Sequence, residues 1–311
     1  MTFQPGQRVS AAERPPAAKP GDRVGIAALS GRIDRDRLAA GVAGLEELGF
    51  EPVLAANLRP EASLSGRPLF AGSDAERLEA FHELAADVSI AAIVFARGGY
   101  GVPRILGQVD WALLAARPRP YVGYSDLTPL LLALVSRTGT MAFHGPMAVD
   151  LARGLLPEER RSFLDALAGR LSGPWALDRV SAGSSAGRPP AIEGRLLGGC
   201  LTMLAASVGT GLLPSFQDSI LVLEDIDEPE YRIDRLLTQL RTSGQATGVR
   251  AVIAGHFTNC DARASLIDFA AALGAPLFTG LPAGHQAPNH TVPLGASVSL
   301  DVRNATLEVE R

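Results

Sequence analysis

Cysteine is scarce in this chain of 311 residues, which contains only Cys200 and Cys260. Two thiols are too few for a framework of disulfide bonds or for a zinc site with four cysteine ligands. We expect both to be small buried residues of a protein that works in a reducing compartment. Secreted proteins that depend on several disulfide bonds are therefore excluded.

Excess positive charge and long apolar runs are also lacking. The chain has 29 Lys and Arg against 33 Asp and Glu, so nucleic-acid binding has little support. No apolar run reaches the roughly 20 residues that a helix needs to span a bilayer. Residues 1–22 are rich in Pro and Ala and lack the apolar centre of a signal peptide. We expect a loose N-terminal arm, a cytoplasmic protein and no membrane partner.

Strand and helix patterns alternate through the first half of the chain. Helical patterns separate the apolar runs, and one of these helices begins with a capping box at 73–76. Such alternation predicts an α/β fold with a parallel sheet and helices on both faces. Ligands of such sheets bind at the carboxyl ends of the strands. The four runs that we interpret as strands are 23–29, 51–56, 90–96 and 121–124.

The length of the chain suggests about two domains. Residues 172–190 are rich in Gly, Ser and Pro, and we interpret them as a linker. This places an N-terminal domain at 19–171 and a C-terminal domain at 191–311. The tail alternates apolar and polar residues around Arg303 and Asn304, which predicts a β-hairpin.

One serine lies where a strand gives way to a helix, in the stretch YVGYSDLTPLL at 121–131. Ser125 or Asp126 could simply cap the helix, because both residue types accept hydrogen bonds from the first turn. Many hydrolases instead expose a nucleophile at such a corner, where the N–H groups at the start of the helix can bind an oxyanion. The local sequence leaves both interpretations open.

Candidate partners for a catalytic serine lie in the second half of the chain. Glu224 directly follows four apolar residues, so it should be the most buried acid of the segment 224–230. A solvated acidic loop and a two-metal carboxylate site are the other interpretations of that segment. Spacing ranks three of the five histidines as near equals for the base: His285, His290 and His144. His82 lies within a helix pattern and His256 at the end of a strand pattern.

A pair of glycines follows the third strand pattern, in the stretch ARGGYG at 96–101. Paired glycines let backbone N–H groups approach a ligand closely, as an oxyanion hole or a phosphate site requires. The stretch lacks the lysine of a P-loop and the spacing of a dinucleotide-binding motif.

Six motifs occur in an order that resembles the LD-carboxypeptidases. This family of serine peptidases includes murein tetrapeptide carboxypeptidase and the microcin C7 self-immunity peptidase. The likeness runs from about Lys19 to the C-terminus. The motifs are FARGGYG, VGYSDLT, FHGPM, LLGGCLTMLAASVGT, LVLEDIDEPEYRIDRLLTQL and GHQAPNHTVPLG.

The resemblance implies a Ser-His-Glu triad of Ser125, His285 and Glu224. It also implies an oxyanion hole made by the backbone N–H groups of Gly99 (or Gly98) and Asp126. The implied fold has an N-terminal α/β domain resembling the class I glutamine amidotransferases and a smaller C-terminal α/β domain. The resemblance further implies a homodimer that needs no metal and no cofactor. One departure is visible: Cys200 stands where the family usually has Asn.

The function implied by the resemblance is cleavage of the amide between an L-diamino acid and D-Ala in murein tetrapeptides during cell-wall recycling. The substrate would then be a small muropeptide. A microcin-immunity-like amidase acting on aminoacyl-nucleotide analogues is an alternative, and Trp175 could then stack on a base or merely anchor its loop. A ligand-binding protein without catalysis is the third hypothesis.

Overall fold

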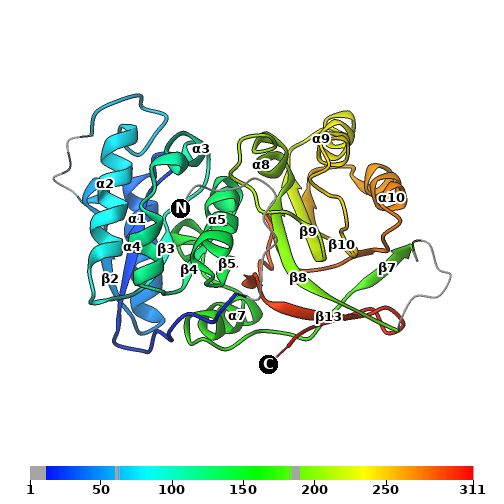
Figure 1. The fold of residues 1–311 in the computed structure, drawn as a ribbon. Helices are drawn as coiled ribbons and strands as arrows, with labels where there is room; N and C mark the ends of the chain where they lie inside the picture. The colour runs from blue at the N-terminus through cyan, green and yellow to red at the C-terminus, as the bar shows by residue number, and fades with distance from the viewer. Residues whose placement is uncertain (1–11, 60–61, 63, 182, 184–189, 311) are drawn as a thin grey trace.

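Two α/β units lie side by side in the computed structural model, which describes residues 12–59, 62, 64–181, 183 and 190–310 (Figure 1). Each unit is built around one sheet. The described strands of the first sheet follow the order β12-β5-β4-β3-β1-β2, and those of the second follow β6-β14-β13-β8-β9-β10-β11-β7. This confirms the predicted α/β class with a mainly parallel N-terminal sheet.

The first sheet is parallel from β2 to β5, and β12 pairs antiparallel with β5 at its edge. Its strands are β1 (Arg23–Ala27), β2 (Glu51–Leu54), β3 (Ile90–Phe95), β4 (Tyr121–Gly123), β5 (Ala142–His144) and β12 (Val292–Leu294). Its α-helices are α1 (Arg35–Glu47), α2 (Asp74–Ala86), α3 (Val102–Ile105), α4 (Trp111–Ala116), α5 (Thr128–Thr138), α6 (Ala148–Leu151) and α7 (Pro157–Leu167). Three short 3-10 turns are η1 (Ala56–Leu58), η2 (Leu106–Gln108) and η3 (Ser125–Leu127).

Local sequence signals account for where these helices begin. Asp34 caps α1 by accepting hydrogen bonds from the N–H groups of the first turn. The predicted capping box at α2 is present, with Ser73 and Glu76 bonded to each other's backbone. The helix predicted after β4 forms as α5, which ends at Gly139 in the left-handed conformation.

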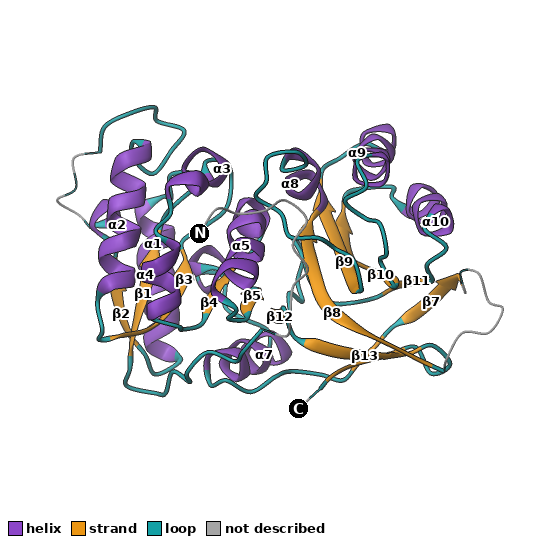
Figure 2. Cartoon of the chain, viewed as in Figure 1, coloured by secondary structure: helices purple, strands orange, loops and turns teal. Residues whose placement is uncertain are grey.

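The second sheet has a parallel centre, β8-β9-β10-β11, flanked by antiparallel strands. Its strands are β6 (Trp175–Ala176), β7 (Asp178–Ser181), β8 (Ala191–Cys200), β9 (Ser219–Ile226), β10 (Ala251–Thr258), β11 (Leu277–Thr279), β13 (Ser297–Asp301) and β14 (Thr306–Val309). Its helices α8 (Leu201–Ala206), α9 (Glu230–Thr242) and α10 (Arg263–Ala272) lie together beside it (Figure 2). β13 and β14 form the predicted C-terminal hairpin.

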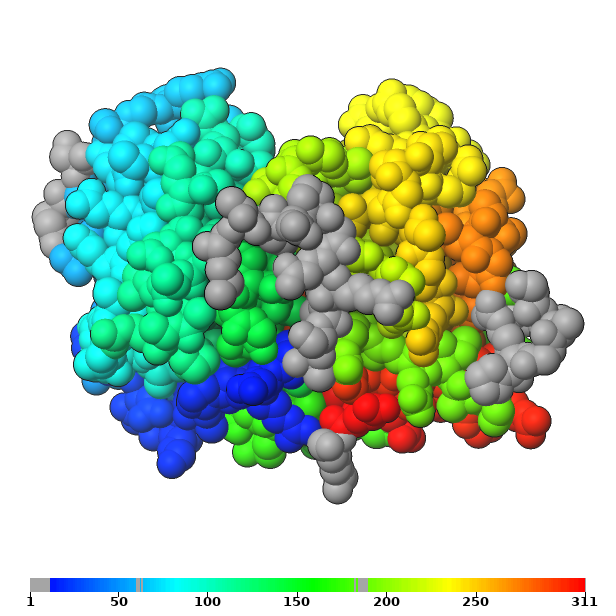
Figure 3. Space-filling view, in the orientation of Figure 1, coloured from blue at the N-terminus to red at the C-terminus, as the bar shows by residue number. Residues whose placement is uncertain are grey.

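The two units share one hydrophobic core. Buried side chains of α2 and α5 belong to the same apolar cluster as those of β8, β9 and β10. A separate cluster packs α1, α6 and α7 on the other face of the first sheet. Figure 3 shows a notch between the two units at the top of this view. A shared core of this kind holds the two units in one relative position.

Two segments differ from their sequence interpretation. The described part of the N-terminal arm is not loose, because Glu13 pairs its backbone with Thr140 and Met141 and Ala18 is buried. Residues 1–11 lie outside the described residues. The described part of 172–190 contributes β6 and β7 to the second sheet, and the division into three segments stays a prediction. In the part of the chain that is described, no helix has the length and apolarity needed to cross a membrane.

β12 has special importance for the site. It follows β11 of the second sheet in the sequence, yet it pairs with β5 of the first sheet. The chain between β11 and β12 therefore crosses from one sheet to the other. His285 lies in this crossing loop.

Candidate active site

Ser125 occupies the corner between β4 and α5. Its φ of 63° is in the left-handed region, which costs a non-glycine residue about 1–3 kcal/mol, and strained residues of this kind cluster at functional sites. Neither the 3-10 turn that begins at Ser125 nor α5 has a side-chain cap. The capping interpretation of Ser125 and Asp126 is therefore wrong, and the strained corner favours the nucleophile interpretation.

The structure brings Ser125, His285 and Glu224 together. The Nε2 atom of His285 lies 3.0 Å from Ser125 Oγ, and its Nδ1 atom lies 2.7 Å from Glu224 Oε2. A carboxylate can only accept a hydrogen bond, so Nδ1 carries the proton. The neutral ring then has Nε2 free to accept the hydroxyl hydrogen of Ser125. This is the arrangement of a serine nucleophile, a general base and an orienting acid.

The surroundings of the acid and the base shift the pKa values of both. Glu224 is fully buried at the end of β9, and burial raises the pKa of its carboxyl. Burial lowers the pKa of His285, but the hydrogen bond and negative charge of Glu224 outweigh it, so that the pKa is raised. A Cβ atom at Gly284 would lie 2.7 Å from Glu224 Oε2, so the loop approaches the acid closely only because glycine stands there.

The glycine pair lies beside the nucleophile. A Cβ atom at Gly98 would stand 2.9 Å from Ser125 Oγ and 3.5 Å from the backbone N of Asp126. Gly99, with a φ of 113°, packs against Gly31. The structure thus brings Gly98, Ser125 and the Asp126 amide together, with Gly99 as the next residue of the same loop. Backbone N–H groups in this position can bind an oxyanion.

The carboxylate of Asp126 links the turn that follows β4 to the glycine loop. It is fully buried and accepts hydrogen bonds from Ser30 Oγ at 2.6 Å and from the Val102 amide at 2.9 Å. Burial raises the pKa of this carboxyl. Asp126 therefore ties the turn that carries the serine to the end of the glycine loop. Sequence reasoning identified the backbone of Asp126 but not this role of its side chain.

The other histidines have different surroundings. His144 is buried at the end of β5, 5.7 Å from the ring of Tyr124, and burial followed by the nearby His285 lowers its pKa to about 3. The Nδ1 atom of His290 accepts a hydrogen bond from Trp175 Nε1 at 3.2 Å. His82 accepts one from the backbone of Asp110 at 3.0 Å, and His256 donates one to the carbonyl of Pro288 at 2.9 Å. Geometry therefore separates His285 from the two histidines that spacing ranked beside it.

Trp175 and Cys200 are both buried, and their contacts are those of structural residues. Trp175 is buried in β6 and its indole N–H is already bonded to His290, which favours the anchor interpretation over base stacking. Cys200 is buried, its Sγ lies 3.7 Å from Asp225 Oδ1, and burial raises the pKa of its thiol. The described residues contain no group of three or more His, Cys, Asp or Glu side chains that could hold a metal ion.

Tyr124 is a site residue that sequence reasoning did not single out. Its ring packs edge-on against the ring of His285, with 4.9 Å between the centroids. Its hydroxyl donates to Asp150 Oδ1 at 3.4 Å. An aromatic residue next to a candidate nucleophile was the available signal, but the sequence alone does not place the histidine ring against it.

Comparison with known proteins identifies the family. Residues 24–145 match the model of the LD-carboxypeptidase N-terminal domain, and residues 193–300 match that of the LD-carboxypeptidase C-terminal domain. The chain belongs to the LD-carboxypeptidase family. This confirms the resemblance that the six motifs indicated.

Several proteins resemble this family member in sequence, and a solved structure also resembles it in fold. The murein tetrapeptide carboxypeptidase of Pseudomonas aeruginosa is 36% identical over 298 residues, which cover 90% of this chain and 93% of the relative. The crystal structure of muramoyltetrapeptide carboxypeptidase from Oxalobacter formigenes matches with a TM-score of 0.77 and 30% identity, over 92% of this chain and 97% of that one. The microcin C7 self-immunity protein MccF of Escherichia coli is 25% identical over 327 residues, 93% of each chain.

These comparisons support a peptidase hydrolase, since the family and two of the relatives named above are carboxypeptidases. The fold class is confirmed at the same time. The expected likeness of the N-terminal domain to the class I glutamine amidotransferases stays a prediction.

Proposed function

We propose that this protein is a serine carboxypeptidase that removes the terminal D-Ala from murein tetrapeptides. It cleaves the amide that joins this residue to an L-diamino acid. The observation that carries the proposal is the hydrogen-bonded series Glu224–His285–Ser125, with distances of 2.7 and 3.0 Å. The named activity of the relative from Pseudomonas aeruginosa supports the choice of substrate.

The geometry suits acyl transfer. Ser125 Oγ attacks the scissile carbonyl while His285 Nε2 takes its proton. Glu224 holds the ring in the required tautomer and stabilises the imidazolium that forms. His285 then gives the proton to the amine of the leaving D-Ala. Water attacks the resulting acyl-enzyme, and His285 acts as base again.

Backbone amides stabilise the negative charge that develops on the carbonyl oxygen. We assign this role to the N–H of Asp126 and to that of Gly99 (or Gly98). Donors of this kind contribute about 3 kcal/mol each to transition-state stabilisation in serine hydrolases. Support comes from the contact between the glycine loop and Ser125.

We base the proposed location, biological process and oligomeric state on the same family. We place it in the cytoplasm, within the recycling of cell-wall peptides, and we expect a homodimer. No metal or cofactor takes part in the proposed steps. The family resemblance is the support for these points.

A second candidate function uses the same chemistry on another substrate. The relative MccF is named as a microcin C7 self-immunity protein, so an amidase acting on aminoacyl-nucleotide analogues is the alternative. The burial of Trp175 does not favour it, because a buried indole whose N–H is bonded to His290 does not offer its face to a nucleobase. A non-catalytic ligand-binding protein is the third candidate, and the geometry around Ser125 does not favour it.

Mass spectrometry of a muropeptide tetrapeptide incubated with the purified protein tests the proposal. We expect the wild type to remove one alanine and Ser125→Ala to remove none. Cleavage of an aminoacyl sulfamoyl adenosine alone would favour the amidase. Absence of both reactions, together with no labelling of Ser125 by a fluorophosphonate, would favour the binding protein.

A further inference from the structure

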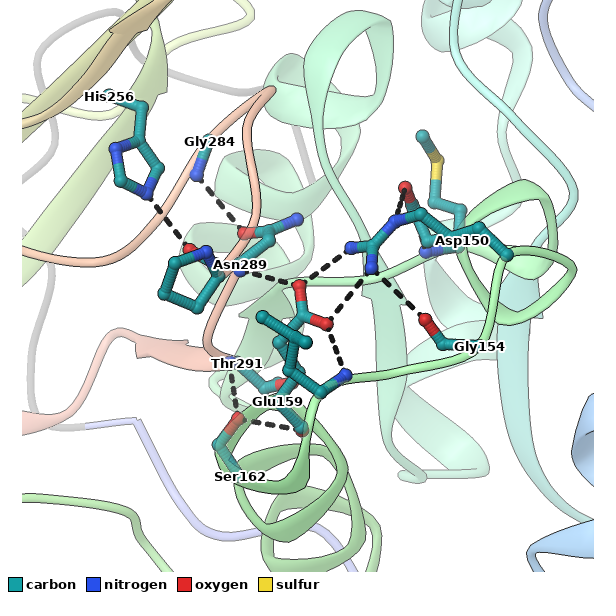
Figure 4. Close-up of polar contacts among 12 residues, drawn as sticks. Asp150, Gly154, Glu159, Ser162, His256, Gly284, Asn289 and Thr291 are labelled. Carbon is teal, nitrogen blue, oxygen red and sulfur yellow. Dashed lines mark hydrogen bonds and ion pairs between the residues drawn. The ribbon is translucent and has the colours of Figure 1, made fainter.

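A fully buried carboxylate lies behind the loop that carries His285. Glu159, at the start of α7, is completely buried and accepts hydrogen bonds from both terminal nitrogens of Arg153, at 2.6 and 3.1 Å. It also accepts from the amides of Leu156 and Asn289, each at 2.7 Å (Figure 4). Burial raises the pKa of this carboxyl, but Arg153 and the two amides outweigh it, so that the pKa is lowered. Glu159 is therefore a charged, fully bonded anchor.

The hydrogen bonds continue from this anchor to the catalytic loop. Asn289 is 1% exposed, and its Oδ1 accepts from the amide of Gly284 at 3.0 Å. Gly284 directly precedes His285. A second bond, from the Thr291 amide to Ser162 Oγ at 3.0 Å, ties the same loop to α7 (Figure 4). The N-terminal unit thus holds the His285 loop at two points through α7.

Arg153 also reaches the ring of His285 by a second route. Its Nε lies 3.9 Å from Asp150 Oδ1, which accepts a hydrogen bond from the hydroxyl of Tyr124 at 3.4 Å. The ring of Tyr124 packs edge-on against that of His285. One guanidinium therefore supports both the backbone before His285 and the aromatic ring beside it.

We propose that the Arg153–Glu159 ion pair, acting through Asn289 and Tyr124, positions His285 on Ser125. This inference rests on the proposed triad. Arg153, Glu159 and Asn289 are positioning residues that act on His285 through its loop, and Tyr124, which precedes Ser125 in the chain, acts through its ring contact with His285. The base comes from a loop that belongs in sequence to the other unit, so its place against the nucleophile depends on contacts such as these. A misplacement of about 1 Å can lower the rate about 100-fold.

Two variants of the pair and one control test the proposal. In Glu159→Gln one oxygen becomes an NH2 group that faces donors, and in Arg153→Lys the two-pronged contact becomes a single one. The control is Asp165→Asn, at a residue of the same helix. This change removes the ion pair between Asp165 and Arg170, whose atoms lie 2.8 Å apart and whose side chains are more exposed than those of the Arg153–Glu159 pair. The readouts are the kinetics of D-Ala release, the rate at which a fluorophosphonate acylates Ser125, and the thermal unfolding midpoint.

We expect kcat and the acylation rate of Glu159→Gln to fall about 10- to 100-fold while KM stays within about threefold. Arg153→Lys should show a smaller loss of the same kind, and Asp165→Asn none. The downfield proton resonance of His285 Nδ1–H should broaden or shift in the two pair variants only. A role limited to stability would lower the unfolding midpoint without moving this resonance or kcat.

The possible results separate this inference from the proposed function. Folded Glu159→Gln and Arg153→Lys with kcat and acylation rates within twofold of wild type would overturn it. If Glu159→Gln does not fold, Arg153→Lys decides, because Lys keeps the charge at a side chain that is 37% exposed. A wild type that is acylated at Ser125 but releases no D-Ala would refute the murein substrate alone, and the acylation rates would still test the positioning.

Discussion

The carboxylate of Glu224 is the group whose replacement tests the proposed mechanism most directly. Glu224→Gln keeps the size of the side chain and removes its charge. If the new NH2 group faces His285 Nδ1, the ring must carry its proton on Nε2, where it cannot accept the proton of Ser125. We expect kcat to fall about 10³- to 10⁴-fold, which corresponds to about 4–5.5 kcal/mol in the barrier.

The same variant should change the pH dependence with a definite sign. His285 must be neutral to act as base, so activity is lost as pH falls through its pKa. Burial lowers this pKa, but Glu224, with smaller contributions from Asp225 and Asp150, raises it. Removing the charge of Glu224 lowers the pKa of His285. The acid limb of kcat/KM should therefore move to lower pH in Glu224→Gln.

Steady-state D-Ala release measured across the pH range, with a thermal unfolding curve for each variant, provides the assay. Glu308→Gln on the exposed face of β14 serves as the control, and its profile should match the wild type. An acid limb that stays in place, or moves to higher pH, would refute the assignment of His285 as a base paired with Glu224. A folded Glu224→Gln variant with near-normal kcat would refute it as well.

Three further predictions concern the surroundings of the nucleophile. Gly98→Ala should lower kcat about 100-fold, because its methyl group would press on the serine hydroxyl, whereas Gly107→Ala, in open space, should leave kcat unchanged. Asp126→Ala should lower the free energy of unfolding by about 1–3 kcal/mol in chemical denaturation, since the buried amide of Val102 loses its acceptor; an unchanged midpoint would contradict this. Iodoacetamide should modify Cys200 only when the chain unfolds, as peptide mapping would show, and rapid modification of the native protein would contradict the burial of this thiol.

Local features of the fold could be predicted from the sequence because they depend on neighbouring residues. The capping box at Ser73 and the C-terminal hairpin each need only a few adjacent side chains. The corner at Ser125 belongs to this group too, since a strand pattern followed by a helix pattern was enough to locate it. Its positive φ is a tertiary result that the pattern did not reveal.

The choice among the histidines could not be made from spacing. His285 reaches Ser125 because β12 pairs with β5, and this pairing joins residues that are far apart in the sequence. Spacing within the crossing loop is the same whichever sheet the next strand joins. Only the family resemblance indicated His285 beforehand, and the structure adds the distances.

The contact of Glu159 with the loop that carries His285 could not be predicted from the sequence for a similar reason. Glu159 stands in the first turn of a helix after a proline, where an acid is ordinary. Its bond to the amide of Asn289 spans 130 residues. The packing of the N-terminal arm was missed because Glu13 is held by backbone hydrogen bonds, which leave no trace in composition.

The pairing of β12 with β5 also constrains the order in which the chain can fold during synthesis. His144 pairs with Val292, so this edge of the first sheet stays open until residues 292–294 have left the ribosome. At about 5–20 residues per second, translation of the intervening chain takes on the order of ten seconds. For that time β5 is an unpaired strand edge, which other chains can pair with. During this time the nascent chain therefore carries an open strand edge beside its future active site.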